Sequence, residues 1–296
     1  TGEPQMTLRE AITAGGVVTF ATLAAISAVD SIESAALGTL APDIRRSLNI
    51  GSGATVFVTS ASGAFLILGS LPMGWLADRY RRGRIIGIAN LVFGVMTMLT
   101  GFAVNIVMLF LARLGVGISK SNQFTVQGSL VADQYPISAR GRIGSSLGLA
   151  GSVTGTLSPL IVGGLTTLIG GPSAWRWTFI LMSLPVSVVS FMAFRLPEPV
   201  RGQYEKRDVL GQIVEDENPL PISVEAAFAR LLQIRTFRSV IAGFAAVGFG
   251  LFTVPVLGNV FMEHRYGLGP LGRGAVGTAG GIAVMLTIPF VGKYYD

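Results

Sequence analysis

The sequence has 296 residues, of which 50% are hydrophobic and only 13% are charged, and its formal net charge is +6. Because soluble domains carry about 25% charged residues, this composition excludes an ordinary water-soluble domain. The chain contains no cysteine, which excludes disulfides, a thiolate nucleophile and a thiolate metal site.

Long apolar segments follow one another along the whole chain. About 20 apolar residues suffice for a helix to cross the hydrocarbon core, and backbone groups in a bilayer must be hydrogen-bonded within the segment. The sequence therefore predicts an all-α integral membrane protein. In chain order, the eight predicted spans are residues 15–41, 54–77, 85–104, 106–132, 143–169, 175–195, 238–262 and 273–294.

The distribution of lysine and arginine predicts the orientation of these spans. With the N-terminus inside, fifteen basic residues lie on the inner side, five lie on the outer side, and two lie within the fourth span. Cytoplasmic loops carry such an excess, so topology explains the positive charge and we expect no nucleic-acid partner. We expect a multi-pass protein of the cell (plasma) membrane, in contact with membrane lipids and with a cytoplasmic N-terminus.

The segment after the sixth predicted span differs from the rest of the chain. From Pro197 onward it is charged and contains several prolines, a composition typical of an exposed linker. It ends in VEAAFARLLQIRTF, whose apolar residues recur at helical spacing, which predicts an amphipathic helix on the inner membrane face. We expect a six-helix bundle in residues 1–196, a cytoplasmic linker in 197–237, and the first two helices of a second bundle in 238–296.

Six short motifs occur in an order that resembles a known family. The first is GWLADRYRRGR, which places five charges between two long uncharged runs, and it is followed by LARLGVG, ADQYPISARGRIG, WRWTFI, EPVRG and GKYYD. Together they resemble the major facilitator superfamily. The surroundings of Glu33 are similar to its spinster-like branch, and its drug-efflux members share most of the motifs.

The first motif contains the residues that we expect to gate the inner side. Gly74 allows two helices to approach closely, and Asp78 can accept hydrogen bonds from a helix N-terminus or from an arginine. The resemblance implies a latch that closes in one state and opens in another, formed by Gly74, Asp78, Arg79 and Arg82. The alternative is that the arginines only anchor the orientation of the chain.

Four ionisable residues lie inside predicted spans, where each costs about 2.5–3.5 kcal/mol on insertion scales. Asp30 and Glu33 share one face of the first span, and Arg113 and Lys120 share one face of the fourth. At about 1.5 Å per residue, Glu33 lies near the depth of Arg113, and Asp30 near the depth of Lys120. We predict two ion pairs across a central cavity, Glu33 with Arg113 and Asp30 with Lys120, and the resemblance implies that these two helices line that cavity.

Such pairs are suited to coupling with protons. A carboxylate can bind a proton when its cation is drawn to an anionic substrate, so Glu33 and Asp30 are the predicted proton-coupling residues. The alternative is a static ion pair that fixes helix packing. Lys120 could instead bind a phosphate or carboxylate of the substrate as a point charge.

Uncharged residues near these charges have two possible roles. Gln123 and Gln127 either line a polar passage or bond to neighbouring helices. Gly151, Gly155 and Pro159 in the fifth span are expected to bring helix backbones together, with a hinge as the alternative.

The leading hypothesis is a proton-coupled secondary active transporter that moves a small organic or amphiphilic substrate, such as a lysolipid, by alternating access. One alternative is a multidrug efflux antiporter. Another is a non-transporting membrane subunit or sensor, because the resembled family usually has twelve helices and this chain shows eight; a missing C-terminal half or a partner chain would complete the pathway. No Walker motif occurs, and we expect no enzyme activity, no cofactor and no metal.

Overall fold

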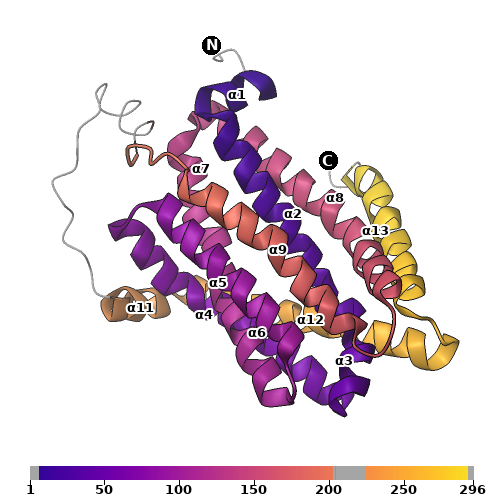
Figure 1. The fold of residues 1–296 in the computed structure, drawn as a ribbon. Coiled ribbons are helices and arrows are strands. Elements are labelled where there is room, and N and C mark those ends of the chain that lie inside the picture. The colour runs from indigo at the N-terminus through magenta and orange to yellow at the C-terminus, as the bar shows by residue number, and fades with distance from the viewer. Residues whose placement is uncertain (1–6, 203, 205–223, 293–296) are drawn as a thin grey trace.

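A computed structural model describes residues 7–202, 204 and 224–292, and these residues are predominantly helical (Figure 1). The all-α prediction is confirmed. Parts of the predicted linker (203 and 205–223), of the last span (293–294) and of the GKYYD motif (293–296) lie outside the described residues. The helices are α1 (Leu8–Gly15), α2 (Val17–Thr39), α3 (Ala41–Leu48), α4 (Ser52–Arg79), α5 (Arg82–Phe102), α6 (Ile106–Lys120), the π-helix η1 (Gln123–Gln127), α7 (Gly128–Gln134), α8 (Ile137–Ile169), α9 (Ala174–Phe194), α11 (Val224–Gln233), α12 (Arg235–Tyr266) and α13 (Pro270–Gly292).

Five of these helices are long and apolar enough to cross a membrane, namely α2, α4, α5, α8 and α9. They match five of the predicted spans to within a few residues, except that α8 begins earlier, at Ile137. The predicted fourth span is divided into α6, η1 and α7. The predicted seventh and eighth spans correspond to α12 and α13, which are not among the five.

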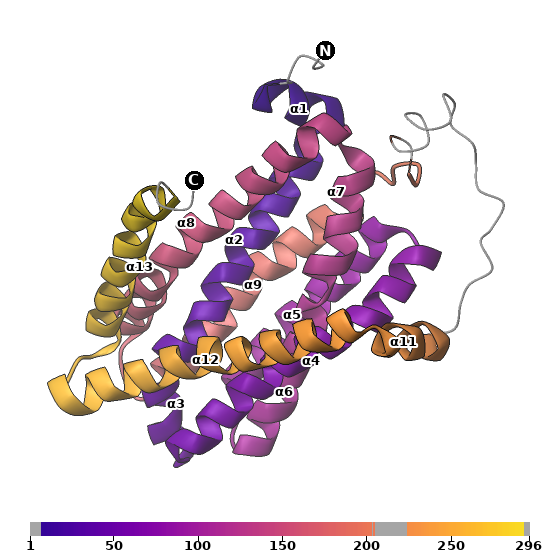
Figure 2. The same ribbon diagram turned by 180° about the vertical axis from the view of Figure 1, so that it is seen from behind.

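The long helices pack in pairs. Helix α5 lies along α9, α2 lies along α8, and α4 lies along α6. Helix α13 packs along α8, whereas α12 crosses α4 and α2 at a steep angle, as Figure 2 shows from behind. The apolar core between the pairs includes Leu37 and Leu40 near α3, packed with the fully buried Phe179 of α9.

Small residues allow helix α8 to contact both of its neighbours closely. A Cβ atom at Gly151 would lie 2.6 Å from Ser27 Oγ of α2, whereas one at Gly155 would make ordinary contact with α2. On the other side, a Cβ at Gly274 of α13 would lie 2.2 Å from the carbonyl oxygen of Pro159. Gly151 and Pro159 therefore lie where α8 meets α2 and α13; the hinge role stays a prediction.

A charged cluster ties α12 and α13 to α3, at the end of the bundle opposite α1 (Figure 1). Arg273, in the first turn of α13, forms an ion pair with Asp43 of α3 and lies 3.8 Å from Glu263 of α12. Arg46 lies 2.7 Å from both Asp43 and Glu263. The Arg273 side chain is 0% exposed. We call these four residues the α3-end cluster; the sequence analysis did not predict it.

Candidate functional site

The four predicted membrane charges lie together in the middle of the bundle. Glu33 of α2 accepts a hydrogen bond from Nη1 of Arg113 on α6 through its Oε1, and its Oε2 lies 2.8 Å from Nζ of Lys120. Glu33 is 0% exposed and Arg113 is 4% exposed. The pairing of Glu33 with Arg113 that the matched depths predict is therefore present.

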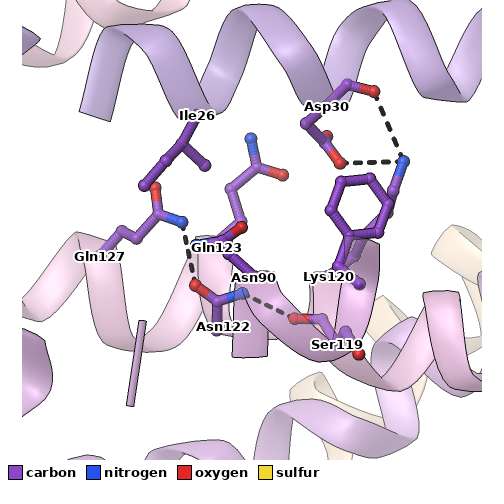
Figure 3. A pocket seen from close by; sticks show the side chains of 9 residues that line it. Ile26, Asp30, Asn90, Ser119, Lys120, Asn122, Gln123 and Gln127 are labelled. Atoms are coloured by element: carbon purple, nitrogen blue, oxygen red, sulfur yellow. Dashed lines mark hydrogen bonds and ion pairs between the residues drawn. The ribbon is translucent and has the colours of Figure 1, made fainter. Parts of the chain in front are cut away.

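Lys120 connects this pair to Asp30. Its Nζ lies 2.9 Å from Asp30 Oδ1 (Figure 3). The same Nζ donates to Ser34 Oγ at 2.6 Å and lies 5.2 Å from the centre of the Phe93 ring. Both predicted ion pairs are therefore present, and Lys120 joins them because it also contacts Glu33. Asp30 and Glu33 lie one helical turn apart on the same face, so one flexible lysine side chain reaches both.

The resulting arrangement, which we call the four-charge cluster, contains two carboxylates and two cations. When all four groups are ionised, its net charge is zero. This balance matters because a charge in a low-dielectric interior is tolerated only when it is paired and hydrogen-bonded. Arg113 is further fixed through its backbone, since Ser62 Oγ of α4 donates to its carbonyl oxygen.

A small cavity of about 10 Å³ adjoins the four-charge cluster and is lined by Asp30, Lys120, Gln123 and Gln127 among others (Figure 3). This volume is close to what a single water requires. Gln127 Nε2 donates to Asn122 Oδ1 at 2.9 Å. Both predicted glutamines therefore line a polar space beside the charges, and Gln127 also bonds within its own helical segment.

The irregular segment after α6 has a local cause. Ser121 Oγ donates to the carbonyl of Ile118 at 2.6 Å, and Asn122 Nδ2 donates to the carbonyl of Ser119, also at 2.6 Å. Such side chains compete with the helical hydrogen-bond ladder, and a π-helical turn follows from Gln123. π-bulges occur frequently at functional sites. The polar run SKSNQFT is the sequence signal that could have predicted this break.

The predicted gating loop is held by two other segments. Arg82 is 6% exposed, and its Nη1 lies 2.5 Å from Oδ2 of Asp133 on α7. Its backbone N–H donates to Oε2 of Glu198 at 2.7 Å. Arg201 donates to carbonyl groups at the C-terminal end of α4, including those of Ala77 and Asp78. The EPVRG motif thus binds the loop between α4 and α5.

Gly74 and the side chains of Asp78 and Arg79 take no part in these contacts. The Asp78 side chain is exposed and makes no hydrogen bond or ion pair within the described residues. Arg82 forms its ion pair with Asp133 instead, and its backbone N–H donates to Glu198. A Cβ at Gly74 would meet no atom within 4 Å. The close helix approach expected at Gly74 is therefore not present in this structure. Arg79 lies over the Trp75 ring at 3.9 Å.

A bundle of long apolar helices around a buried, charge-balanced cluster defines an integral membrane protein of the multi-helix class. The sequence profile of the Major Facilitator Superfamily matches residues 23–296. The chain therefore belongs to the Major Facilitator Superfamily.

Individual relatives agree with this assignment. The chain is similar to the 4-hydroxybenzoate transporter PcaK of Pseudomonas aeruginosa, with 28% identity over 232 residues, which are 72% of this chain and 48% of that protein. It is also similar to the probable galactarate/D-glucarate transporter GudP of Bacillus subtilis, with 28% identity over 165 residues, covering 54% of this chain and 35% of that protein. The chain thus spans half or less of the length of these relatives.

Among solved structures, the chain aligns with a bacterial homologue of the human lysosomal transporter Spinster in an inward-facing conformation. The TM-score is 0.73 at 20% sequence identity, and the alignment covers 94% of this chain and 62% of that one. This likeness shows the fold.

Proposed function

We propose that this protein is a proton-coupled secondary active transporter of a small organic carboxylate, working by alternating access in the cell membrane with its N-terminus in the cytoplasm. The observation that carries the proposal is the buried four-charge cluster, in which Glu33 contacts both cations. The relatives support the substrate class, because 4-hydroxybenzoate, galactarate and D-glucarate are all organic carboxylates.

Charge balance links the substrate to the proton. A carboxylate that binds to Lys120 adds a negative charge to a cluster whose net charge is zero. An unbalanced charge is costly in a buried site, and a proton on Glu33 or Asp30 restores the balance. The anion and the proton therefore bind more favourably together than separately, which is the thermodynamic requirement for coupling.

The two cations have different roles in this scheme. Arg113 is held by Glu33 and by the contact of its backbone with Ser62, and it stays in place. Lys120 has a flexible stem and a compact ammonium group, and its contacts with Asp30, Glu33 and Ser34 can be exchanged for a substrate carboxylate. Glu33 senses the exchange because it loses one of its two cations.

The experiment is proton uptake into proteoliposomes that contain the protein and an interior pH dye. We expect 4-hydroxybenzoate or D-glucarate to drive proton movement. Glu33→Gln keeps the shape of the side chain but cannot ionise, and it should reduce the rate of substrate-driven proton uptake at least tenfold. Glu10→Gln removes an exposed carboxylate of α1 and is the matched control. Proton-coupled uptake at the wild-type rate in Glu33→Gln would refute the proposal.

A further inference from the structure

The cavity beside the four-charge cluster is more polar than the charges alone require. Next to Asp30 and Lys120, its lining contains five uncharged polar residues and only two apolar ones. The uncharged polar residues are Asn90, Ser119, Asn122, Gln123 and Gln127. Four of them carry amide groups, each with two donor hydrogens and an acceptor oxygen.

Part of this hydrogen-bonding capacity is not used inside the protein. Asn90 Nδ2 donates to the carbonyl of Ile86 at 2.8 Å, and Gln127 Nε2 donates to Asn122. In the part of the chain that the structure describes, the amide of Gln123 has no protein partner, and it lies between Asp30 and Gln127 (Figure 3). The oxygens of Asn90 and Gln127 likewise make no hydrogen bond within the described residues.

These groups form a row that starts at the ammonium group. Gln123 and Gln127 follow Lys120 by three and seven residues, so they lie along one side of the α6–η1 segment. Asn90 lines the same cavity from α5. A carboxylate bound to Lys120 would therefore direct the rest of its molecule along the amides. A six-carbon ligand needs more room than the present cavity of about 10 Å³, so binding requires the surrounding helices to separate.

We propose that this row selects polyhydroxylated carboxylates, such as sugar acids, over alkyl and aromatic carboxylates; the inference rests on the transport function proposed above. A hydroxyl group both donates and accepts, as an amide does, so a chain of hydroxyls satisfies the row. An alkyl chain or an unsubstituted ring leaves the amides unpaired after it displaces water. Sites built to hydrogen-bond hydroxyls strongly reject analogues that lack them.

The test uses two ligands of equal length and charge. D-Glucarate and adipate are both six-carbon dicarboxylates, and they differ in four hydroxyl groups. Binding to the purified protein is measured by titration calorimetry, and proton uptake is measured in proteoliposomes. We expect D-glucarate to bind at least tenfold more tightly than adipate. Gln123→Leu should reduce this preference to threefold or less, whereas Gln233→Leu, an exposed position on α11, should leave it unchanged.

The outcomes separate the two proposals. If adipate or benzoate binds as tightly as D-glucarate and drives proton uptake, the substrate class is overturned and the transport function stands. If none of the three binds or moves protons, both proposals are overturned. Because the comparison of ligands uses the unchanged protein, it decides the question even if Gln123→Leu does not fold.

Discussion

Replacing Arg273 by methionine should destabilise the protein by about 3 kcal/mol. The Arg273 side chain is 0% exposed, pairs with Asp43 and donates to the Leu268 carbonyl at 3.1 Å. Removing one partner from a buried ion pair costs about 3–5 kcal/mol. We expect the lower end of this range, because Arg46 keeps its 2.7 Å contacts with both Asp43 and Glu263.

The assay is equilibrium unfolding in mixed micelles with increasing SDS, followed by tryptophan fluorescence. Arg265→Met, an exposed position in the last turn of α12, is the control and should stay within about 0.5 kcal/mol of the wild type. The double variant Asp43→Asn with Arg273→Met should lose less than the sum of the single variants, since the two residues interact. Equal stability of the Arg273 and Arg265 variants would refute the reasoning.

Two further pairs of variants test the packing with the same unfolding assay. Arg82→Gln should cost about 3 kcal/mol because it leaves Asp133 without its 2.5 Å contact, whereas Arg84→Gln at the neighbouring exposed position should change little. Gly274→Ala should cost about 1–3 kcal/mol because its Cβ would lie 2.2 Å from a backbone oxygen of α8. Gly280→Ala, whose Cβ meets open space, should stabilise α13 by about 0.5–1 kcal/mol. Equal effects within either pair would contradict the structure.

The sequence predicted the helices and two central contacts for physical reasons. Lipid requires long, internally hydrogen-bonded segments, so composition alone located the helices to within a few residues in most cases. The contacts of Glu33 with Arg113 and of Asp30 with Lys120 follow from two constraints, the fixed rise of a helix and the cost of an unpaired buried charge. The additional contact of Lys120 with Glu33 did not follow, because a flexible side chain can reach more than one turn of the facing helix.

Contacts between distant parts of the chain could not be predicted in the same way. Asp43 and Arg273 are 230 residues apart, and each lies near a helix end, where charged residues are common. Their pairing depends on how α13 packs against α8 and brings its first turn to α3. For Asp78, the motif indicated a partner for an arginine, but the carboxylate that pairs with Arg82 is that of Asp133 on α7. Motif spacing therefore located the loop between α4 and α5, but it did not identify the carboxylate that pairs with Arg82.

Different segments are held together by polar contacts at the two ends of the bundle, and the proposed alternating access requires one of these sets of contacts to break. The contacts of Arg82, Glu198 and Arg201 join segments within residues 77–202. The α3-end cluster joins α3 to α12 and α13 instead. Separating α12 and α13 from α3 would break the α3-end cluster and leave the contacts of Arg82 intact. A penalty of about 3 kcal/mol that falls only on the closed arrangement shifts the equilibrium away from closure by roughly 100-fold, and this is the shift expected at this end for Arg273→Met.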